Sequence, residues 1–258
     1  TNFLKDQAPL LHDEYILERY KEGLTGKSSN TPAPKFDIPK PKFDTNIFSN
    51  LKKVNFLNKE HPARAYLSQR QIPESLLSIF YYAEDFNAWA KLNNNQKESR
   101  IIIPLISQDG KVFGYQGRSL DKNTKLRYIT TILDKDYPKL FGLDRVNNTQ
   151  KVYVTEGPFD SLFLSNAIAM CGSDVTLDVA QFTNLVYVLD NEPRNYEIVK
   201  KYEKLIQSGK QIVIWPNTIK EKDLNDMIMS GHNVQRVVDS NIYSGLEATI
   251  KLNAWKKV

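Results

Sequence analysis

The sequence predicts an α/β protein in which a mixed α+β lobe with an antiparallel sheet precedes a lobe built on a mostly parallel sheet. Three observations support this. Two apolar segments on either side of Asp109-Gly110 are typical of a β-hairpin. After residue 150, short apolar segments alternate with helical ones, which is typical of a parallel sheet with helices on both faces. A stretch rich in proline and lysine separates both lobes from the start of the chain.

Residues 1–46 are predicted to hold a helix, within 1–24, followed by an extended linker. Apolar residues of 1–24 recur near helical spacing. In the linker, Pro32, Pro34 and Pro39 alternate with lysines, a composition with little tendency to form regular structure. We expect the helix to belong to another part of the molecule or to pack loosely on the main body.

Residues 47–150 are predicted to form the α+β lobe. The segment His61–Arg70 has helical spacing. Arg100–Ile106 is typical of a buried strand, and Lys111–Arg118 of the strand that returns beside it. Leu126–Ile132 is a third expected strand. The sheet of this lobe should therefore be antiparallel.

Residues 151–258 are predicted to form the lobe with the parallel sheet. Its helix boundaries carry local signals, because Pro158 suits a first helical turn and Gly209 suits a helix end. Strands are expected at Lys151–Thr155, Ile168–Cys171, Leu185–Leu189 and Gln211–Trp215, and helices at Pro158–Asn166, Tyr196–Gln207, Lys222–Met229 and Leu246–Trp255.

The composition limits the metal chemistry of the chain. Cys171 is the only cysteine, so an internal disulfide and a zinc site built on thiolates within this chain are both excluded. We expect it to be a small buried residue. The histidines His12, His61 and His232 are far apart, which leaves carboxylates as ligands and favours Mg²⁺ or Mn²⁺. The formal charge of +5 is consistent with a polyanionic partner.

Two classes of protein are excluded by pattern. No segment approaches the roughly 18 apolar residues of a membrane span, and no secretory leader is evident. A soluble, cytoplasmic protein without a membrane partner is therefore expected. Gly26-Lys27-Ser28 matches the end of a P-loop, but Lys21 stands where that motif requires its first glycine. A helicase motor of the P-loop type is excluded.

Acidic residues follow three of the expected strands in the second lobe. Glu156 follows the first, Asp190 and Glu192 follow the third, and Asp223 and Asp226 come after the fourth. Ligands of open α/β sheets bind beyond the carboxyl ends of the strands, so these acids should meet at one rim and could hold magnesium. The alternative for each acid alone is a cap on the following helix.

At these positions the sequence resembles a known module. The stretches EGPFD (156–160), CGS (171–173), LDNE (189–192) and KDLND (222–226) resemble the TOPRIM module of bacterial-type primases, type IA and II topoisomerases and some nucleases. One residue departs from the pattern, because Glu192 stands where the module usually has aspartate. The resemblance implies a Rossmann-like fold for the second lobe.

The sequence of the preceding lobe distinguishes between the kinds of protein that contain a TOPRIM module. The stretch RIIIPLISQDGKVFGYQGRSL (100–120), followed by LRYIT (126–130) and KLFGL (139–143), resembles the amino-terminal half of a primase polymerase domain. Topoisomerases lack this arrangement. The chain looks most like the primases of T4-like bacteriophages. It is therefore expected to be a DNA primase, a nucleotidyltransferase that joins ribonucleoside triphosphates into short RNA primers on single-stranded DNA during replication.

The resemblance implies a role for each acid. Glu156, Asp190 and Glu192 would be the catalytic residues near Mg²⁺, with Mn²⁺ as a possible substitute. Asp223 and Asp226 would be supporting ligands. No residue is expected to form a covalent intermediate, because nucleotidyl transfer depends on position and electrostatics.

It also implies a set of basic residues that hold the template or the incoming triphosphate: Arg118, Arg127, Lys139 and Lys222. Guanidinium groups bind phosphate through two hydrogen bonds, whereas lysine acts as a point charge. Tyr115 and Tyr128 could stack on bases, but we expect them to be core residues. Gly157 and Gly172 would allow a close approach of the backbone.

The family implies two further partners. A cysteine-rich zinc module normally precedes the polymerase domain and is missing from this chain. The start at Thr1 and the linker rich in proline and lysine are expected of a chain from which that module was removed, or to which it is supplied separately. The replicative helicase would be a separate chain. Two other functions stay open. One is a TOPRIM nuclease, which uses the same acids to activate water. The other is a non-catalytic scaffold that binds single-stranded DNA and a helicase, which stays open because Glu192 replaces the usual aspartate.

Overall fold

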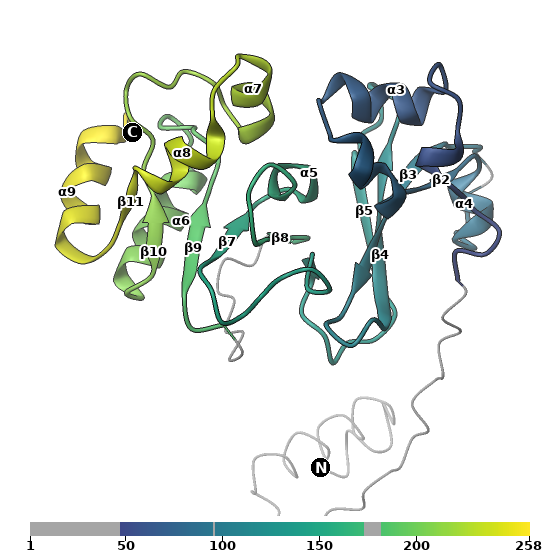
Figure 1. The fold of residues 1–258 in the computed structure, drawn as a ribbon, viewed down its shortest axis with the longest axis horizontal. Coiled ribbons are helices and arrows are strands. Elements are labelled where there is room, and N and C mark those ends of the chain that lie inside the picture. Colours follow the sequence, from purple (N-terminus) through teal and green to yellow (C-terminus); the bar gives the residue numbers. More distant parts are fainter. Residues whose placement is uncertain (1–46, 95, 173–181) are drawn as a thin grey trace, which may run out of the picture. The chain divides into compact units, whose positions relative to one another are not determined.

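The computed structural model describes residues 47–94, 96–172 and 182–258. The helix and linker predicted within 1–46 lie outside the described residues, as does Ser173 of the CGS stretch. The chain from Phe43 to Val258 forms one compact unit. Within it, the described strands form two sheets (Figure 1), so the predicted α/β class is confirmed.

The first sheet has five antiparallel strands. Their order is β1 (Lys52–Lys53), β2 (Tyr81–Ala83), β3 (Arg100–Ile106), β4 (Val112–Ser119) and β5 (Tyr128–Ile132). The predicted hairpin and third strand are confirmed, and Gly110 adopts a positive φ of 82° in the hairpin turn. The strands β1 and β2 were not predicted, because two or three residues are too few to show alternation.

Short helices accompany this sheet. They are η1 (Val54–Phe56), α3 (Pro62–Gln69), η2 (Glu74–Ile79) and α4 (Phe86–Trp89). The helix predicted from His61 to Arg70 is confirmed as α3. His61 caps it, because its Nδ1 accepts a hydrogen bond from the Ala63 N–H at 3.2 Å.

The second sheet has six strands in the order β11-β10-β9-β7-β8-β6. Their bounds are β6 (Leu140–Phe141), β7 (Val152–Thr155), β8 (Ala167–Met170), β9 (Leu185–Val188), β10 (Gln211–Val213) and β11 (Ile242–Tyr243). The four central strands are parallel and both edge strands are antiparallel, which confirms a mostly parallel sheet. The edge strand β6 lies before residue 150 in the sequence, within the range predicted for the first lobe. A segment of that range therefore forms one edge of the second sheet.

The direction of strand addition reverses inside the second sheet. The step from β7 to β8 runs toward one edge, and the step from β9 to β10 runs toward the other. The reversal falls between the neighbours β7 and β9. Since crossovers between parallel strands are right-handed, the connecting helices lie on opposite faces. Such a switch point is where open α/β sheets bind ligands.

The helices of this lobe are α5 (Pro158–Ser161), α6 (Tyr196–Gln207), α7 (Leu224–Met229), α8 (Val234–Asp239) and α9 (Gly245–Trp255). The helix predicted to reach Asn166 ends at Ser161, so its predicted length was wrong. Asn166 has a positive φ of 56°, and its side-chain amide donates to the carbonyl of Lys151 at 2.7 Å, which stabilises a turn. None of the described helices is long and apolar enough to cross a membrane.

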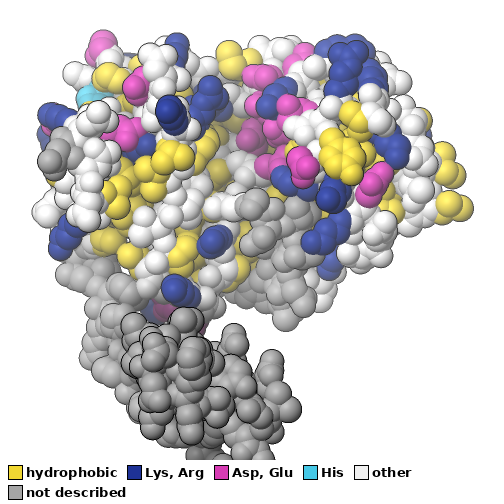
Figure 2. All heavy atoms as spheres, turned by 180° about the vertical axis from the view of Figure 1, so that it is seen from behind, with side chains coloured by type: hydrophobic (Ala, Val, Ile, Leu, Met, Phe, Trp, Pro, Cys, Tyr) yellow, Lys and Arg dark blue, Asp and Glu magenta, His cyan; other side chains and the backbone are white. Residues whose placement is uncertain are grey.

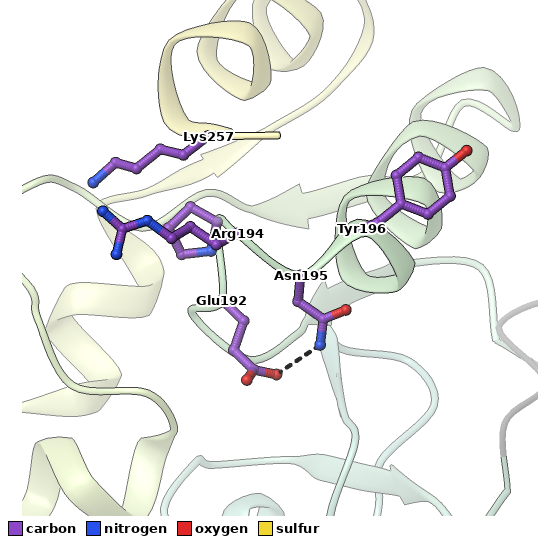
Figure 3. Close-up of a pocket in the computed structure, with 6 residues that line it drawn as sticks. Glu192, Arg194, Asn195, Tyr196 and Lys257 are labelled. Atoms are coloured by element: carbon purple, nitrogen blue, oxygen red, sulfur yellow. Dashed lines mark hydrogen bonds between the residues drawn. The ribbon is translucent and has the colours of Figure 1, made fainter.

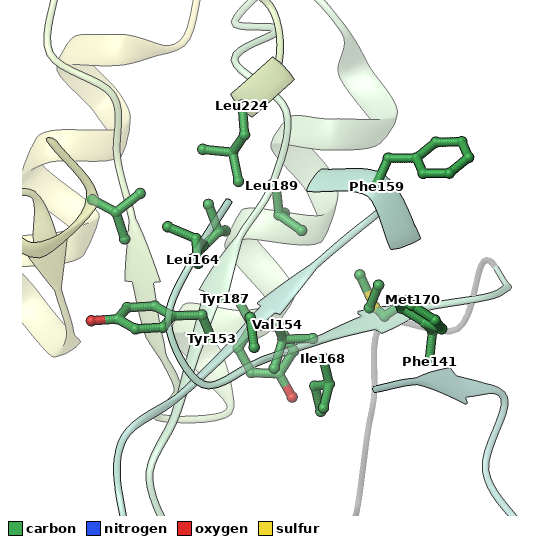
Figure 4. Close-up of a cluster of buried hydrophobic side chains, with 14 of the residues drawn as sticks. Phe141, Tyr153, Val154, Phe159, Leu164, Ile168, Met170, Tyr187, Leu189 and Leu224 are labelled. Carbon is green, nitrogen blue, oxygen red and sulfur yellow. The ribbon is translucent and has the colours of Figure 1, made fainter. Parts of the chain in front are cut away.

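One large apolar cluster connects the two sheets. It includes Ile101, Ile103 and Phe113 of the first sheet and the buried residues of β7, β8 and β9; Figure 4 shows its part around the second sheet. Alternate residues of β3 face the other way, and Ile102 packs with Tyr115 in a smaller cluster. The expectation that Tyr115 is a core residue is therefore confirmed.

Candidate active site

The acids that follow β7 and β9 meet at the switch point. Glu156 directly follows β7, and Asp190 comes two residues after the end of β9. The backbone N–H of Asp190 donates a hydrogen bond to Glu156 Oε2 at 3.2 Å. Figure 2 shows acidic side chains gathered in one patch in its right half, with Lys and Arg side chains at its border. The predicted meeting of these two acids is thus observed.

The acids at this rim repel one another. Burial raises the pKa of Asp190 to about 8, and the charges of Glu156, Asp160 and Asp223 add to this effect. Burial also raises the pKa of Asp160 to about 7, with a further contribution from Asp223. Such shifts arise where carboxylates share a poorly solvated space. They are frequent at functional sites.

Asp160 belongs to this group, although the sequence analysis assigned it no role. It lies in the first turn of α5, and its Oδ1 accepts a hydrogen bond from the Asn225 N–H at 3.3 Å. A Cβ on Gly157 would lie 2.7 Å from Asp160 Oδ2, so the predicted close approach at Gly157 is used by this carboxylate. One feature of the sequence could have indicated a role for Asp160, because it is the last residue of the EGPFD stretch and stands four residues after Glu156.

Asn191 connects the acid loop after β9 to the loop before α7. Its Nδ2 donates to the carbonyl of Glu221 at 3.0 Å, and its backbone N–H donates to the carbonyl of Lys222 at 2.6 Å. Its Oδ1 accepts a hydrogen bond from Trp255 Nε1 at 3.1 Å. The residue between Asp190 and Glu192 therefore holds two acidic segments together.

The last two predicted acids lie at the start of α7. Asp223 caps this helix, because its Oδ1 accepts a hydrogen bond from the Asp226 N–H at 2.8 Å. Asp223 is therefore a helix cap, the other role considered for each acid. Its charge also raises the pKa of Asp160 and of Asp190. Partial burial and the charge of Asp223 raise the pKa of Asp226.

Two lysines pair with the acids. Lys201 of α6 forms an ion pair with Glu156. Lys222 Nζ lies 3.2 Å from Glu192 Oε1 and 3.9 Å from Asp190 Oδ2. Although partial burial opposes it, the hydrogen bond to Glu192 and the nearby acids raise the pKa of Lys222. Lys201 was not predicted, because its direction depends on how α6 packs.

The donor set has the chemistry of a site for a hard divalent cation. Among the described residues, no three His, Cys, Asp or Glu side chains are already arranged to hold a metal ion. All donors at the rim are oxygens, however, which Mg²⁺ prefers. Burial, together with the charges of the neighbouring carboxylates, raises the pKa of Asp190, and a bound cation would favour the ionised form.

A hydrogen-bonded pair joins α3 beside the first sheet to α7 beside the second. Arg70 Nη1 donates to Asn225 Oδ1 at 3.1 Å, and Asn225 Nδ2 donates to the carbonyl of Arg70 at 2.6 Å. Asn225 is only 4% exposed. The Arg70 guanidinium also lies over the rings of Tyr66 and Phe159, at 5.1 and 5.5 Å from their centroids. This junction fixes Asp160 and α7 relative to the first lobe.

Among the predicted basic residues, Arg118 is the most tightly held. Its guanidinium lies over the rings of Tyr128 and Tyr66, with centroid distances of 4.7 and 5.5 Å. Its Nε is buried without a hydrogen-bond partner in the described part of the chain. Tyr128 keeps 38% of its surface exposed, so it is not a core residue like Tyr115.

Arg127 and Lys139 are exposed, and no ion pair within the described ranges links either to the acids. Arg100 holds the loop of Arg127, because its Nη1 donates to the Arg127 carbonyl at 3.3 Å. The Lys139 carbonyl accepts a hydrogen bond from the Cys171 N–H at 2.9 Å. Cys171 is buried, as predicted, and burial raises its pKa to about 12. A Cβ on Gly172 would make only an ordinary contact, at 3.6 Å from Lys139.

Solved structures identify the fold. The chain superposes on the RNA polymerase domain of Mycobacterium tuberculosis primase, solved with a double-stranded DNA oligomer that has a 6-nucleotide overhang. The TM-score is 0.60 at 16% identity, over 78% of this chain and 79% of that one. For Aquifex aeolicus primase, solved with its zinc-binding and RNA polymerase domains, the TM-score is 0.54 at 20% identity, over 71% of this chain and 56% of that one. The fold is therefore that of a primase catalytic core.

Sequence comparison identifies the family. No protein-family model matches the chain. The chain is 34% identical to the DNA primase of Enterobacteria phage T4 over 274 aligned positions, which cover 99% of this chain and 78% of that protein. It is 27% identical to the DNA primase of Mycoplasma genitalium over 77% of this chain and 34% of that protein. The chain belongs to the DNA primase family represented by the phage T4 enzyme.

Proposed function

We propose that this chain joins ribonucleoside triphosphates into short RNA primers at the rim formed by Glu156 and Asp190. The observation that carries the proposal is the hydrogen bond of 3.2 Å between the Asp190 N–H and Glu156 Oε2, at the switch point of the parallel sheet. The family supports the reaction class, since the phage T4 relative is a DNA primase. The acids would be the catalytic centre.

We further propose Mg²⁺, or Mn²⁺, as the cofactor. Glu156, Asp190 and Glu192 would hold it, with Asp223 and Asp226 close by. A bound divalent cation neutralises charge on the triphosphate and lowers the pKa of the attacking hydroxyl. The fit rests on the all-oxygen donor set and on the raised pKa of Asp190.

In the proposed reaction, the 3′ oxygen of the growing primer forms a bond to the α-phosphorus of the incoming nucleotide. The bond from that phosphorus to the β-phosphate oxygen breaks, pyrophosphate leaves, and the hydroxyl proton passes to solvent. The chain's own residues position the reactants. Lys222, now paired with Glu192, would instead meet a phosphate, and Arg118, Arg127 and Lys139 would hold the template or the triphosphate.

The solved relatives support the DNA template and the zinc-binding module as partners, and the replicative helicase is proposed from the sequence resemblance alone. The template would be single-stranded DNA, which is supported by a solved structure of a primase catalytic domain bound to single-stranded DNA. A zinc-binding module, such as the one in the A. aeolicus structure, and a replicative helicase would act with this chain in the cytoplasm of a bacterial host. We place the functional division between a basic lobe, residues 47–150, and a TOPRIM lobe, residues 151–258.

The test is incorporation of labelled ribonucleotides on single-stranded DNA in the presence of Mg²⁺ or Mn²⁺. A short ribonucleotide primer is supplied, so that initiation is not required. Wild-type protein should extend the primer, and Asp190→Asn should reduce extension by at least about 100-fold. Asp121→Asn, at an exposed acid beside the first sheet, is the matched control and should keep full activity.

The other two functions give different results in the same assay. Cleavage of labelled nucleic acid without any need for ribonucleotides would select a nuclease. Binding of DNA without turnover, even after a zinc-binding module is added in trans, would select a scaffold. Full extension by Asp190→Asn would show that the metal site has been assigned wrongly.

A further inference from the structure

A cavity lies beside the acid rim and contains charges that the proposed reaction does not use. Its volume is about 610 Å³, and it is lined by Glu192, Pro193, Arg194, Asn195, Tyr196 and Lys257 (Figure 3). Glu192 lines the cavity and is also one of the acids at the rim. Whatever occupies the cavity therefore lies next to the catalytic acids.

Arg194 and Lys257 carry positive charge that is not neutralised within the described residues. Both side chains are exposed, and neither takes part in an ion pair or side-chain hydrogen bond with another described residue. Two neighbouring lysines, by contrast, are paired: Lys222 with Glu192 and Lys256 with Glu203, at 3.2 and 3.0 Å. Both charges of Arg194 and Lys257 are therefore available to a ligand in the cavity.

The single acid of the cavity does not balance them. Glu192 Oε1 is bound by Lys222, and its Oε2 accepts a hydrogen bond from Asn195 Nδ2 at 3.3 Å, drawn as the dashed line in Figure 3. The cavity therefore has an excess of positive charge. This favours an anionic ligand.

The backbone fixes the two cations side by side, although they are far apart in sequence. The Lys257 N–H donates a hydrogen bond to the carbonyl of Pro193 at 2.8 Å. Just before it, the Trp255 ring packs on Tyr202 of α6 with a centroid distance of 5.1 Å. The end of the chain is therefore held against the segment that carries Arg194.

We propose that this cavity binds the phosphodiester backbone of a single nucleic-acid strand as it passes the acid rim. Figure 3 shows Arg194 and Lys257 extending toward one side of the cavity and Tyr196 on the other side. Tyr196 is 64% exposed, which leaves its ring free to stack on a base. Cations on one side and an aromatic ring on the other fit a strand with successive phosphates and bases better than one small anion.

The proposal rests on the proposed function, because a strand must reach the acids, but it is tested by binding alone. Binding of a fluorescein-labelled single-stranded oligodeoxynucleotide to the full chain is followed by anisotropy at several salt concentrations, in EDTA. The variant Arg194→Gln/Lys257→Gln should weaken binding at least about 10-fold. It should also reduce the slope of log K against log salt by about 1.4, since each phosphate contact with a single strand contributes roughly 0.7.

The control variant removes the same charge elsewhere. Lys204→Gln/Lys251→Gln changes one exposed lysine on α6 and one on α9, outside the cavity lining, and should alter binding less than about two-fold. Tyr196→Ala should weaken binding at least about 5-fold, whereas Tyr196→Phe should not, because stacking needs only the ring. Circular dichroism verifies that each variant folds.

A second ligand tests whether the cavity binds the phosphates of a nucleic-acid strand or those of a free nucleoside triphosphate. Labelled ATP is titrated into the same variants. Loss of strand binding in the cavity variant supports the proposal, whatever happens to ATP. Equal losses in the cavity and control variants, or weakened ATP binding with unchanged strand binding, would overturn it. Primer extension fails or succeeds independently of these titrations, so failure of the proposed function is distinguished from failure of the cavity assignment.

Discussion

The two sheets use their charged residues in opposite ways. In the antiparallel sheet, Arg100 and Arg118 are held by carbonyl oxygens or aromatic rings within the lobe. In the parallel sheet, Glu156 and Asp190 stand at strand ends, where they repel each other. Parallel strands end at the same edge, whereas antiparallel neighbours end at opposite edges. The parallel sheet can therefore concentrate like charge at one place, whereas the antiparallel sheet packs against it through a shared apolar cluster.

The largest expected effect concerns the joint between the sheets. Phe159 of α5 contacts Phe80 and Tyr66 of the first lobe, with ring centroids 5.5 and 6.0 Å apart. Phe159→Ala should lower the free energy of unfolding by about 3–5 kcal/mol, because it leaves a cavity between the lobes. Urea unfolding measures this. Phe56→Ala, at a ring that is 78% exposed, is the control, and equal losses in both variants would contradict a shared core.

The next effect concerns the polar junction. Asn225→Ala removes the donor to the partly buried carbonyl of Arg70, and it should cost about 2 kcal/mol, since that acceptor and the Arg70 guanidinium both lose a partner. The measurement is again urea unfolding. Asn217→Ala, at an exposed asparagine, should change stability by less than about 0.5 kcal/mol. A similar small change in Asn225→Ala would mean that the junction does not hold the lobes together.

The third prediction concerns the cost of burying the Asp190 charge, which the neighbouring acids increase. The folded pKa of Asp190, about 8, is raised above its ordinary value, so the folded protein binds a proton that the unfolded chain releases. Stability should therefore fall as pH rises from about 4 to about 8. Asp190→Asn removes this loss, and at pH 8 in EDTA it should be more stable than wild type by about 2 kcal/mol.

Thermal unfolding at pH 5 and pH 8 measures this difference. The gain from Asp190→Asn should be small at pH 5 and larger at pH 8, while primer extension is lost at both. The exposed-acid variant Asp121→Asn corrects for the general effect of removing one negative charge. A gain that does not depend on pH would contradict the raised pKa of Asp190.

The smallest expected effect concerns Arg118 in the antiparallel sheet. Arg118→Lys keeps the charge but loses the planar group that lies between Tyr66 and Tyr128, and it should cost roughly 1 kcal/mol of stability. Arg118→Gln loses the charge as well and should weaken oligonucleotide binding more. Equal binding by the two variants would show that Arg118 serves only as packing.

Much of the parallel sheet could be predicted from the sequence. Its strands β7, β8 and β9 are runs of four buried residues, and such runs bounded by polar residues are recognisable. The acids after them could be placed because strand direction determines where they meet. The site therefore follows from local pattern plus one rule of topology.

The remaining features depend on tertiary packing. The Arg70–Asn225 pair joins residues 155 positions apart, and nothing in either local sequence indicates the other. The pairing of Lys201 with Glu156 depends on the rotation of α6. The strand β6 has only two residues, and it became part of the second sheet by pairing with β8. Such features need the folded arrangement, because the local pattern is compatible with several partners.

The hydrogen bonds that two tryptophan indoles donate near Asp190 also make the fluorescence of the protein sensitive to this loop. Trp215 Nε1 donates to the carbonyl of Leu189 at 2.8 Å, and Trp255 Nε1 donates to Asn191 Oδ1 at 3.1 Å, so two of the three tryptophans are bonded to the residues on either side of Asp190. The third, Trp89, packs in the smaller cluster of the first sheet and provides an internal reference. Ultraviolet-excited emission therefore reports on the acid loop without any attached dye, and titration with a divalent cation can be followed in the unmodified chain.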